Sequence, residues 1–410
     1  MQTESDTVTD GTGLSRRLNL PLLVLYGLGV TVGAGIYVLV GAVAAEAGIY
    51  APLSFLVAAI VTACSALSFA ELAVRYPESA GEAIYVDEGF GLPALSLITG
   101  LAVTFAGLLS AATVSLGAAA YLAEITAIPP WAGAVVIVAA LGAFAARGIV
   151  ESVVFAGLLT AIEIGGLILI CTGAVLFVPD LAENAGAMWH LPDRAALGGI
   201  MSAAVIAFFA FIGFEDMVNV VEEVKRPART IPLAIIITLI LTTLIYLAVT
   251  TVAILVVGAD DLAASSAPLA DVAEKTGLLN ATTLSIIAVL AGINGILVQI
   301  IMASRILYGL ANRGRLPAWF GKVSARRHTP VNATLAVTVA VLIFALTFPL
   351  DRLATATSLI TLMVFSIVNV ALVLIKRRHT DFQPVFQVPL IVPVIGCLFS
   401  LMLLSVELFA

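Results

Sequence analysis

Charged residues are scarce in this chain of 410 residues. Only 11% of them are Asp, Glu, Lys or Arg, against roughly a quarter in an ordinary soluble domain, whereas 61% are hydrophobic. This balance excludes a soluble globular core. Basic tracts are also missing, and the formal net charge of −7 is spread over short loops, so we expect no nucleic-acid partner.

Histidine and cysteine are equally rare. The three cysteines lie singly in apolar stretches, which gives neither a disulfide framework nor a metal-ligand spacing. The three histidines, His190, His328 and His379, fall in loops, where none suits a proton relay inside a membrane. The longest loops carry no nucleophile and base, so we expect no enzyme, no metal and no organic cofactor.

Long apolar runs dominate what is present. A helix needs about 20 apolar residues to cross roughly 30 Å of hydrocarbon. Eleven runs between turn signals approach or exceed that length, which predicts an all-α polytopic protein with about 11 transmembrane helices in a lipid bilayer. The runs are 21–46, 52–75, 93–124, 130–146, 152–178, 197–221, 232–257, 282–311, 331–348, 354–375 and 389–408.

The distribution of basic residues predicts the orientation. With the N-terminus inside, only Arg194, Lys275 and Arg352 of the 19 Lys and Arg fall on the outer side. This asymmetry is the positive-inside signal and supports the number of spans. We therefore expect a multi-pass protein of the cytoplasmic membrane whose polar residues 1–17 form a disordered cytosolic tail.

Two spans contain signs of a helix break. The first has four glycines between Gly27 and Gly35, and the sixth has the acidic pair Glu215 and Asp216 at membrane depth. These two spans start five spans apart, which suggests a repeat of five spans. Because five is odd, the second copy of such a repeat crosses the membrane in the opposite direction. Interrupted helices at matching positions in two halves indicate the binding site of an inverted-repeat transporter. The expected repeats are 18–178 and 197–378, and 387–410 adds one further helix.

The motifs at these breaks resemble the amino acid-polyamine-organocation (APC) superfamily. Residues 33–37, GAGIY, match its first-helix pattern, and residues 208–232, FFAFIGFEDMVNVVEEVKRPARTIP, match its sixth-helix pattern and the adjoining loop. The likeness extends from residue 18 to 378 and implies an amino acid permease with a five-plus-five inverted-repeat (LeuT-like) fold. Family members commonly carry a twelfth helix, whereas this chain ends after the eleventh expected span.

The two breaks supply the expected substrate site. Amides at the start of a half-helix can hold a carboxylate, and carbonyls at the end of the other half can hold an ammonium group. The resemblance adds an aromatic gate at Phe209. The alternatives are close helix packing for the glycines and a phenylalanine that merely faces lipid or core. The expected substrate-binding residues are Thr31, Gly33, Ala34, Gly35, Phe208, Phe209, Ala210, Phe211 and Gly213.

Glu163 lies near the middle of the fifth span without a basic neighbour in sequence. Ionisable groups in a membrane usually pair, exchange a proton or line a pathway. In some APC relatives this position carries a lysine, so the charge is reversed here. Glu163 is therefore a candidate proton carrier, a partner for a cationic substrate or another bound cation, or a structural hydrogen-bonding group. The eighth span lacks the Ser/Thr pair typical of a sodium site.

Other polar residues near the cytoplasmic end allow several roles. Glu215 either contacts a substrate amine or braces the broken helix, and Asp216 is expected to be more peripheral. A mixed cluster of Glu222, Glu223, Lys225, Arg226 and Arg229, which Arg75, Glu78 and Glu82 could meet, is either a gate or a solvated surface. Candidate lining residues on other helices, most of them expected to join helices, are Thr104, Ser110, Asn294, Gln299, Ser358 and Asn369.

These features together favour a secondary transporter of an amino acid or amine that works by alternating access and uses the proton gradient. An exchanger or exporter without proton coupling is the first alternative. A membrane sensor or scaffold that has lost transport is the second, although both breaks are intact. No sequence feature specifies an oligomeric state.

Overall fold

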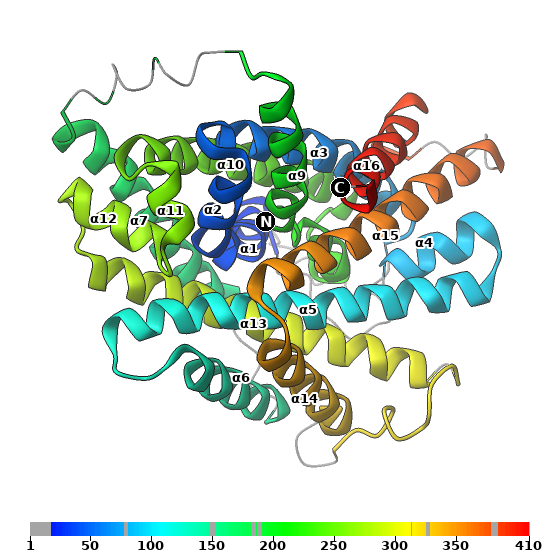
Figure 1. The fold of residues 1–410 in the computed structure, drawn as a ribbon. Helices are drawn as coiled ribbons and strands as arrows, with labels where there is room; N and C mark the ends of the chain where they lie inside the picture. Colours follow the sequence, from blue (N-terminus) through cyan, green and yellow to red (C-terminus); the bar gives the residue numbers. More distant parts are fainter. Residues whose placement is uncertain are drawn as a thin grey trace, which may run out of the picture.

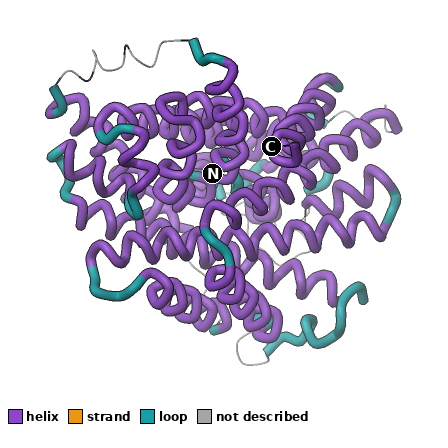
Figure 2. The backbone as a smooth tube through the Cα atoms, viewed as in Figure 1, coloured by secondary structure: helices purple, strands orange, loops and turns teal. Residues whose placement is uncertain are grey.

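The computed structural model describes residues 18–77, 81–147, 153–179, 181, 186, 191–312, 314–324, 329–378 and 384–409. In these residues the regular elements are helices, with no strand (Figure 2). Each of the eleven expected spans contains a helix, which confirms the all-α polytopic class. The tail 1–17, Glu78 and the three histidines lie outside the described residues.

The helices follow one another closely along the chain. They are α1 (Leu20–Thr31), α2 (Gly33–Ala47), η1 (Gly48–Tyr50), α3 (Ala51–Arg75), α4 (Gly81–Phe90), α5 (Pro93–Ile125), α6 (Pro130–Ala146), α7 (Val153–Phe177), α9 (Arg194–Phe209), η3 (Phe214–Glu223), α10 (Pro227–Val256), α11 (Ala259–Ala264), α12 (Pro268–Thr276), α13 (Ala281–Asn312), α14 (Val331–Thr347), α15 (Leu350–Arg378) and α16 (Ile391–Phe409).

Length and composition suit these helices to a bilayer. Within the described part of the chain, seven helical stretches are long and apolar enough to cross a membrane. Four shorter apolar helices, α1, α6, α14 and most of α16, accompany them. Large hydrophobic side chains such as Val175, Leu176 and Ile343 are exposed, as expected for surfaces that lipid covers.

Local signals set the helix starts. The Asn19 side chain accepts a hydrogen bond from the Leu22 amide at 3.1 Å and caps α1, and Asp193 caps α9 in the same way. α10 begins at Pro227, whereas the apolar run predicted a start at Pro232. The predicted start lies too far along the chain, because the first turn of α10 contains the charged residue Arg229 and an apolar run does not include such a turn.

Three short helices were not expected. α4, α11 and α12 lie in segments that the apolar runs left as loops. Each is too short or too polar to appear as an apolar run, and α12 is amphipathic, with one face buried. α4 is the important one, because it places Glu82 beside the helices of the membrane domain.

The long helices form two groups. In the first, α1 and α2 pack with α9 and α10, and α3 packs with both α9 and α10. In the second, α5 lies along α13, and α6 and α14 pack beneath them (Figure 1). α7 and α15 contact both groups, and α16 packs on α15 and α3.

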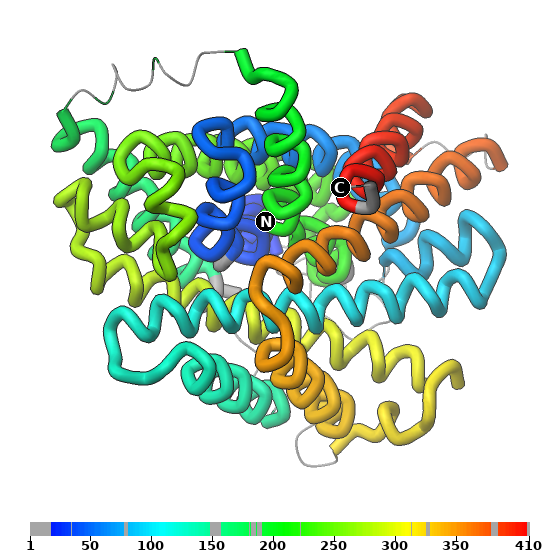
Figure 3. Tube along the Cα trace, in the orientation of Figure 1, coloured from blue at the N-terminus to red at the C-terminus, as the bar shows by residue number. Residues whose placement is uncertain are grey.

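Segments far apart in sequence meet at the centre of the first group. α2 lies beside α9 although more than 140 residues separate them (Figure 3). Leu18 and Val224 form an isolated parallel bridge, in which the Leu18 amide donates to the Glu223 carbonyl at 3.0 Å. The bridge ties the start of α1 to the end of η3, so both interrupted helices are joined at this end.

Candidate functional site

The first helix is interrupted at residues 31–33, here the helix-1 break. α1 ends at Thr31, α2 begins at Gly33, and Val32 lies between them. Gly33 has φ +25°, and a Cβ there would meet no atom within 4 Å. No side chain caps the N-terminus of α2. Gly33 thus has open space in the Cβ direction, and the N-terminus of α2 has no side-chain acceptor, which leaves that helix end free for an anion.

The sixth helix is interrupted at residues 210–213, here the helix-6 break. After α9 ends, the amides of Ala210, Phe211 and Ile212 each bond to the carbonyl three residues earlier, at 3.0 to 3.1 Å. Gly213 then takes φ +127°, which favours glycine, and the chain continues as the 3₁₀-helix η3. A 3₁₀-helix of ten residues is unusual, and such stretches mark hinges or strained sites.

The two breaks touch each other. A Cβ on Gly35 would lie 3.0 Å from the Ala210 Cα atom, and a Cβ on Gly213 would lie 2.9 Å from the Val30 carbonyl oxygen. Neither approach leaves room for a side chain. The structure thus confirms that both helices are broken, and it packs the two breaks closely against each other.

Tyr246, from α10, bridges the two breaks. Its hydroxyl lies 2.7 Å from the Thr31 carbonyl oxygen, 3.3 Å from that of Val32 and 2.7 Å from that of Ala210. A hydroxyl has one proton, so these three acceptors share a single donor. Each carbonyl has a further lone pair, and the three oxygens form a cluster suited to a group with several N–H donors.

Sequence reasoning missed Tyr246. The available signal was weak, since Tyr246 is the one aromatic residue in an otherwise aliphatic α10. Its ring packs edge-on against Phe55 at 5.5 Å and Phe211 at 5.1 Å between centroids. This packing fixes the ring, and the fixed ring positions the hydroxyl.

The aromatic residues expected at the substrate site are all buried. Phe208 packs against Phe365 of α15 at 5.7 Å, and Phe211 packs against Tyr246. Phe209, the last residue of α9, is 4% exposed. Its position beside the helix-6 break agrees with a gate, and the gating role itself stays a prediction.

Glu163 lies beside the helix-1 break. In α7, its carbonyl accepts a hydrogen bond from the Tyr37 hydroxyl of α2 at 2.9 Å. Its side chain is 2% exposed, and Oε1 has no hydrogen-bond partner among the described residues. One buried acid group therefore stands next to α2, at the turn that follows the helix-1 break.

Glu215 braces the broken helix. Its Oε2 atom accepts a hydrogen bond from the Gly213 amide at 2.8 Å, as one of the two expected roles requires. Asp216 was expected to be more peripheral, and this was wrong. It is 8% exposed against 9% for Glu215, and both residues line a cavity of ≈ 40 Å³ next to the helix-6 break. The turn at Gly213 and the start of η3 bring both residues to this cavity, which no apolar pattern in the sequence indicates.

The six candidate lining residues divide by role. Ser110 and Gln299 line the same cavity. Asn369 joins α15 to α3 through hydrogen bonds with Ser65 and Ser68 at 2.9 and 2.7 Å, as expected for a residue that joins helices. The Thr104 hydroxyl donates to its own helix. Buried oxygens of Asn294 and Ser358 have no partner in the described structure.

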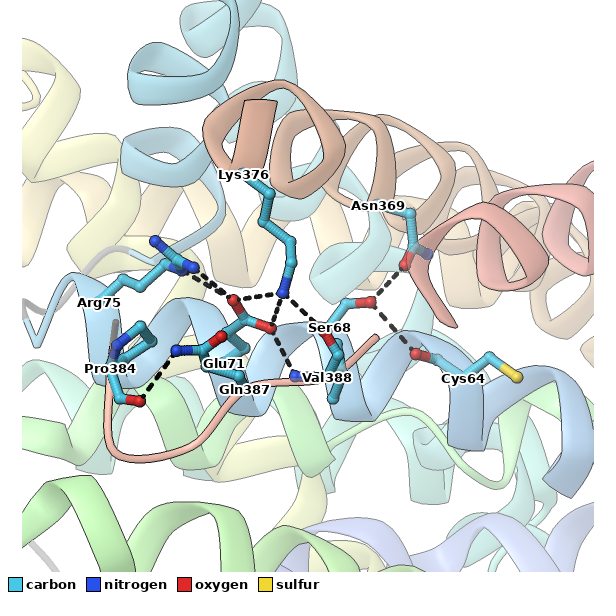
Figure 4. A network of polar contacts seen from close by, with 9 residues as sticks. All are labelled: Cys64, Ser68, Glu71, Arg75, Asn369, Lys376, Pro384, Gln387 and Val388. Atoms are coloured by element: carbon cyan, nitrogen blue, oxygen red, sulfur yellow. Dashed lines mark hydrogen bonds and ion pairs between the residues drawn. The ribbon is translucent and has the colours of Figure 1, made fainter. Parts of the chain in front are cut away.

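A buried ion-pair network lies at the end of the molecule that carries α4 (Figure 4). Glu71 of α3, fully buried, bonds to Arg75 at 2.7 Å and to Lys376 of α15 at 2.7 Å. It also accepts the Val388 amide at 2.8 Å, and Lys376 donates to the Val388 carbonyl at 2.6 Å. Glu71 thus ties α3 and α15 to the segment before α16.

Arg75 and Glu82, which could meet the charged cluster at the end of the sixth span, have further contacts in the structure. Arg75 binds Glu71, one helical turn earlier, and Glu82 lines the cavity with Glu215 and Asp216. Glu71 was not among the predicted residues. It lies at the end of an apolar span, one helical turn before Arg75, which was expected to lie with charged residues at the surface.

Comparison with known proteins agrees with this architecture. Residues 18–410 match the family model described as amino acid permease. The chain is 29% identical over 418 residues to the branched-chain amino acid permease BcaP of Bacillus subtilis (strain 168), covering 95% of this chain and 88% of that protein. It is 30% identical to the mitochondrial cationic amino acid transporter 3 and 31% identical to the vacuolar cationic amino acid transporter 4 of Arabidopsis thaliana.

The alignments with the two plant proteins cover 88% and 90% of this chain but only 63% and 65% of the plant proteins. The family match extends over residues 18–410 and therefore includes both breaks, α7 with Glu163, and the cavity. The chain therefore belongs to the amino acid permease family of the APC superfamily.

Proposed function

We propose that this protein is a secondary transporter that binds an amino acid between the helix-1 and helix-6 breaks. The observation that carries the proposal is the cluster of carbonyl oxygens that both breaks supply, from Thr31, Val32 and Ala210, around one hydroxyl. The substrate carboxylate binds the first amides of α2, including those of Gly33 and Ala34, where the helix dipole favours an anion. Its ammonium group binds the carbonyl oxygens at the ends of α1 and α9.

Tyr246 occupies the ammonium position in this conformation. Its hydroxyl provides one donor to the Thr31, Val32 and Ala210 carbonyls, whereas an ammonium group provides three. Substrate binding therefore exchanges one donor for several. The tyrosine satisfies the buried carbonyls while the site holds no substrate.

Transport proceeds by alternating access. The first helix group, with both breaks, moves against the α5–α13 group, and Phe209 closes over the bound substrate. The repeats 18–178 and 197–378 form the two inverted halves. The end with α4 and the Glu71 network faces the cytoplasm, because this end holds most of the basic residues, and the N-terminus lies on the same side.

Glu163 couples transport to the proton gradient. Its carboxyl is buried without a basic partner among the described residues, and burial in a low-dielectric site disfavours the charged form unless another charge compensates it. Glu163 contacts Tyr37 of α2, so proton binding at Glu163 and substrate binding at the N-terminus of α2 act on adjoining groups. A proton carried with the substrate removes the cost of an isolated negative charge.

The experiment is uptake of labelled amino acids into proteoliposomes, with and without an inward proton gradient. We expect wild-type accumulation to require the gradient. Glu163→Gln retains shape and hydrogen bonding but cannot release a proton. Gradient-driven accumulation is therefore lost, while labelled amino acid still exchanges for unlabelled amino acid in preloaded vesicles. Glu46→Gln, which changes an exposed acid at the end of α2, is the matched control.

Two results would contradict parts of this proposal. Accumulation that ignores the proton gradient and survives Glu163→Gln would make the protein an exchanger and Glu163 structural. No movement of any amino acid, with the purified protein monodisperse, would favour a sensor or scaffold that has lost transport.

A further inference from the structure

The cavity beside the helix-6 break gathers acidic groups from two elements. It has a volume of ≈ 40 Å³ and lies between α4, α5, η3, α13 and α15. Glu82 of α4 and both Glu215 and Asp216 of η3 line it, and these three residues are 6%, 9% and 8% exposed. No lysine or arginine lines it among the described residues. Three buried carboxyl groups therefore face one space without a compensating cation.

The carboxyl oxygens are only partly satisfied. Glu215 accepts the Gly213 amide, but Asp216 Oδ2 has no hydrogen-bond partner in the described chain. A buried carboxylate without partners costs free energy, so such groups are normally paired or bound to a ligand. The arrangement leaves acceptors directed at the cavity.

Two hydroxyl groups give an independent indication. Ser110 of α5 and Thr361 of α15 line the cavity, are 7% and 5% exposed, and make no hydrogen bond within the described structure. Several other buried hydroxyls on these helices bond to their own backbone, as Thr113 does in α5 and Ser366 in α15, although Ser358 of α15 also lacks a partner in the described structure. A group bound in the cavity would supply a partner for Ser110 and Thr361.

We propose that this cavity binds the positively charged end of the substrate side chain, an ammonium or guanidinium group, so the transported amino acid is cationic. The inference rests on the proposed transport function and names its substrate class. A cavity needs roughly 10–15 Å³ of water-accessible volume to hold one water molecule. This cavity has ≈ 40 Å³ and therefore holds one small polar group rather than a whole amino acid.

Position and chemistry both favour the side chain of a substrate. Ile212, within the helix-6 break, lines the cavity, so a side chain can extend from an α-carbon held at the breaks into it. A metal ion fits less well, because the described residues include no cluster of three or more His, Cys, Asp or Glu that could hold one. N–H donors match carboxyl, hydroxyl and amide oxygens without strict coordination geometry.

The test compares amino acids that differ in charge but hardly in shape. Binding of lysine against norleucine, and of arginine against citrulline, is measured by calorimetry on the full chain in lipid nanodiscs. We expect wild type to prefer the charged member by at least about tenfold, since hydrogen bonds to a charged group are worth more than neutral ones. Glu82→Gln and Asp216→Asn should each weaken lysine binding about tenfold and leave norleucine within about twofold.

Control variants separate this effect from damage to the fold. Glu88→Gln removes an exposed carboxyl from the same helix, α4, and should change neither affinity. If the carboxyl variants do not fold, Ser110→Ala and Thr361→Ala replace them, with a smaller expected loss of about threefold for lysine alone.

The outcomes distinguish the two proposals. Equal affinity for lysine and norleucine, or variants that weaken both alike, would overturn the cationic pocket and leave amino acid transport standing. If sodium or potassium binds and lysine does not, and Asp216→Asn abolishes the ion binding, the cationic pocket is also overturned and amino acid transport still stands. If no amino acid binds or moves, the transport proposal fails first and this inference fails with it.

Discussion

At the scale of single residues, the site depends on groups that lack ordinary partners. The Tyr246 hydroxyl serves three carbonyl oxygens with one proton, and Glu163 Oε1 and Asp216 Oδ2 have no hydrogen-bond partner in the described structure. Buried polar groups in proteins are nearly always paired. In our proposal a solute and a proton supply the partners that these three groups lack.

Replacing the Tyr246 hydroxyl tests the bridge between the breaks. Tyr246→Phe retains the ring contacts with Phe55 and Phe211 but removes the donor shared by the carbonyls. Leaving buried acceptors unpaired costs about 1–3 kcal/mol, so the melting temperature of the substrate-free protein should fall. Added substrate should restore more stability in the variant than in wild type, because its ammonium group supplies the missing donors. An unchanged melting temperature would mean that the bridge contributes little.

The pH dependence of substrate binding tests Glu82. Burial raises the pKa of the Glu82 carboxyl to about 7. The titratable groups around it are Glu215 and Asp216 of η3 and Tyr85 of its own helix, while α5, α13 and α15 present uncharged side chains to the cavity. Below pH 7 Glu82 is neutral, and above it the added negative charge favours a cation.

Lysine affinity in nanodiscs should therefore increase as the pH rises from 6 to 8, while norleucine affinity changes little. In Glu82→Gln this increase should be smaller, and Glu88→Gln should behave as wild type. Calorimetry at three pH values measures these affinities. A lysine affinity that falls as the pH rises, or an equal slope in Glu82→Gln, would contradict the assigned role.

At the scale of helices, the breaks and the Glu71 network have opposite properties. The breaks offer backbone groups to a ligand in our proposal, whereas in the network both oxygens of the Glu71 carboxylate already accept hydrogen bonds. Glu71 connects α3 to α15 and to the segment before α16, so it joins one moving group to the helices beside it. We expect it to hold these elements together at the end of the protein that faces the cytoplasm in our proposal.

Glu71→Gln tests that role. The change removes the carboxylate that both Lys376 and Arg75 bind, and removing one partner of a buried ion pair costs about 3–5 kcal/mol. The melting temperature in detergent should fall strongly, and adding Lys376→Met should recover part of the loss. The control is the exposed pair of Asp351 and Arg352, 4.0 Å apart, where Asp351→Asn should cost less than about 1 kcal/mol. Equal effects of Glu71→Gln and Asp351→Asn would refute the structural role.

At the scale of the whole molecule, hydrophobicity, glycine and an acidic pair were enough to predict the spans and the breaks from the sequence. Apolar runs located eleven spans, the glycines from Gly27 to Gly35 located the first break, and Glu215 with Asp216 at membrane depth located the second. The APC resemblance assigned the family, which comparison confirmed.

Interactions between distant helices could not be predicted in this way. Tyr246, the pairing of Glu71 with Lys376, and the convergence of Glu82 with Asp216 each depend on packing between segments far apart in sequence. Apolar periodicity is silent about such contacts, since it indicates which residues are buried and not which residues they face. α4 was missed because it is too short and too polar to form an apolar run, and the place of Glu82 was missed with it.

The most direct test of the proposed site is a cryo-electron microscopy structure of the full chain in nanodiscs with saturating lysine. We predict density between the breaks, with the carboxylate at the Gly33 amide, the α-ammonium at the Thr31 and Ala210 carbonyls and the Tyr246 hydroxyl displaced, and with the side chain ending near Asp216. Lysine bound elsewhere, while the Tyr246 hydroxyl still bridges the two breaks, would contradict it.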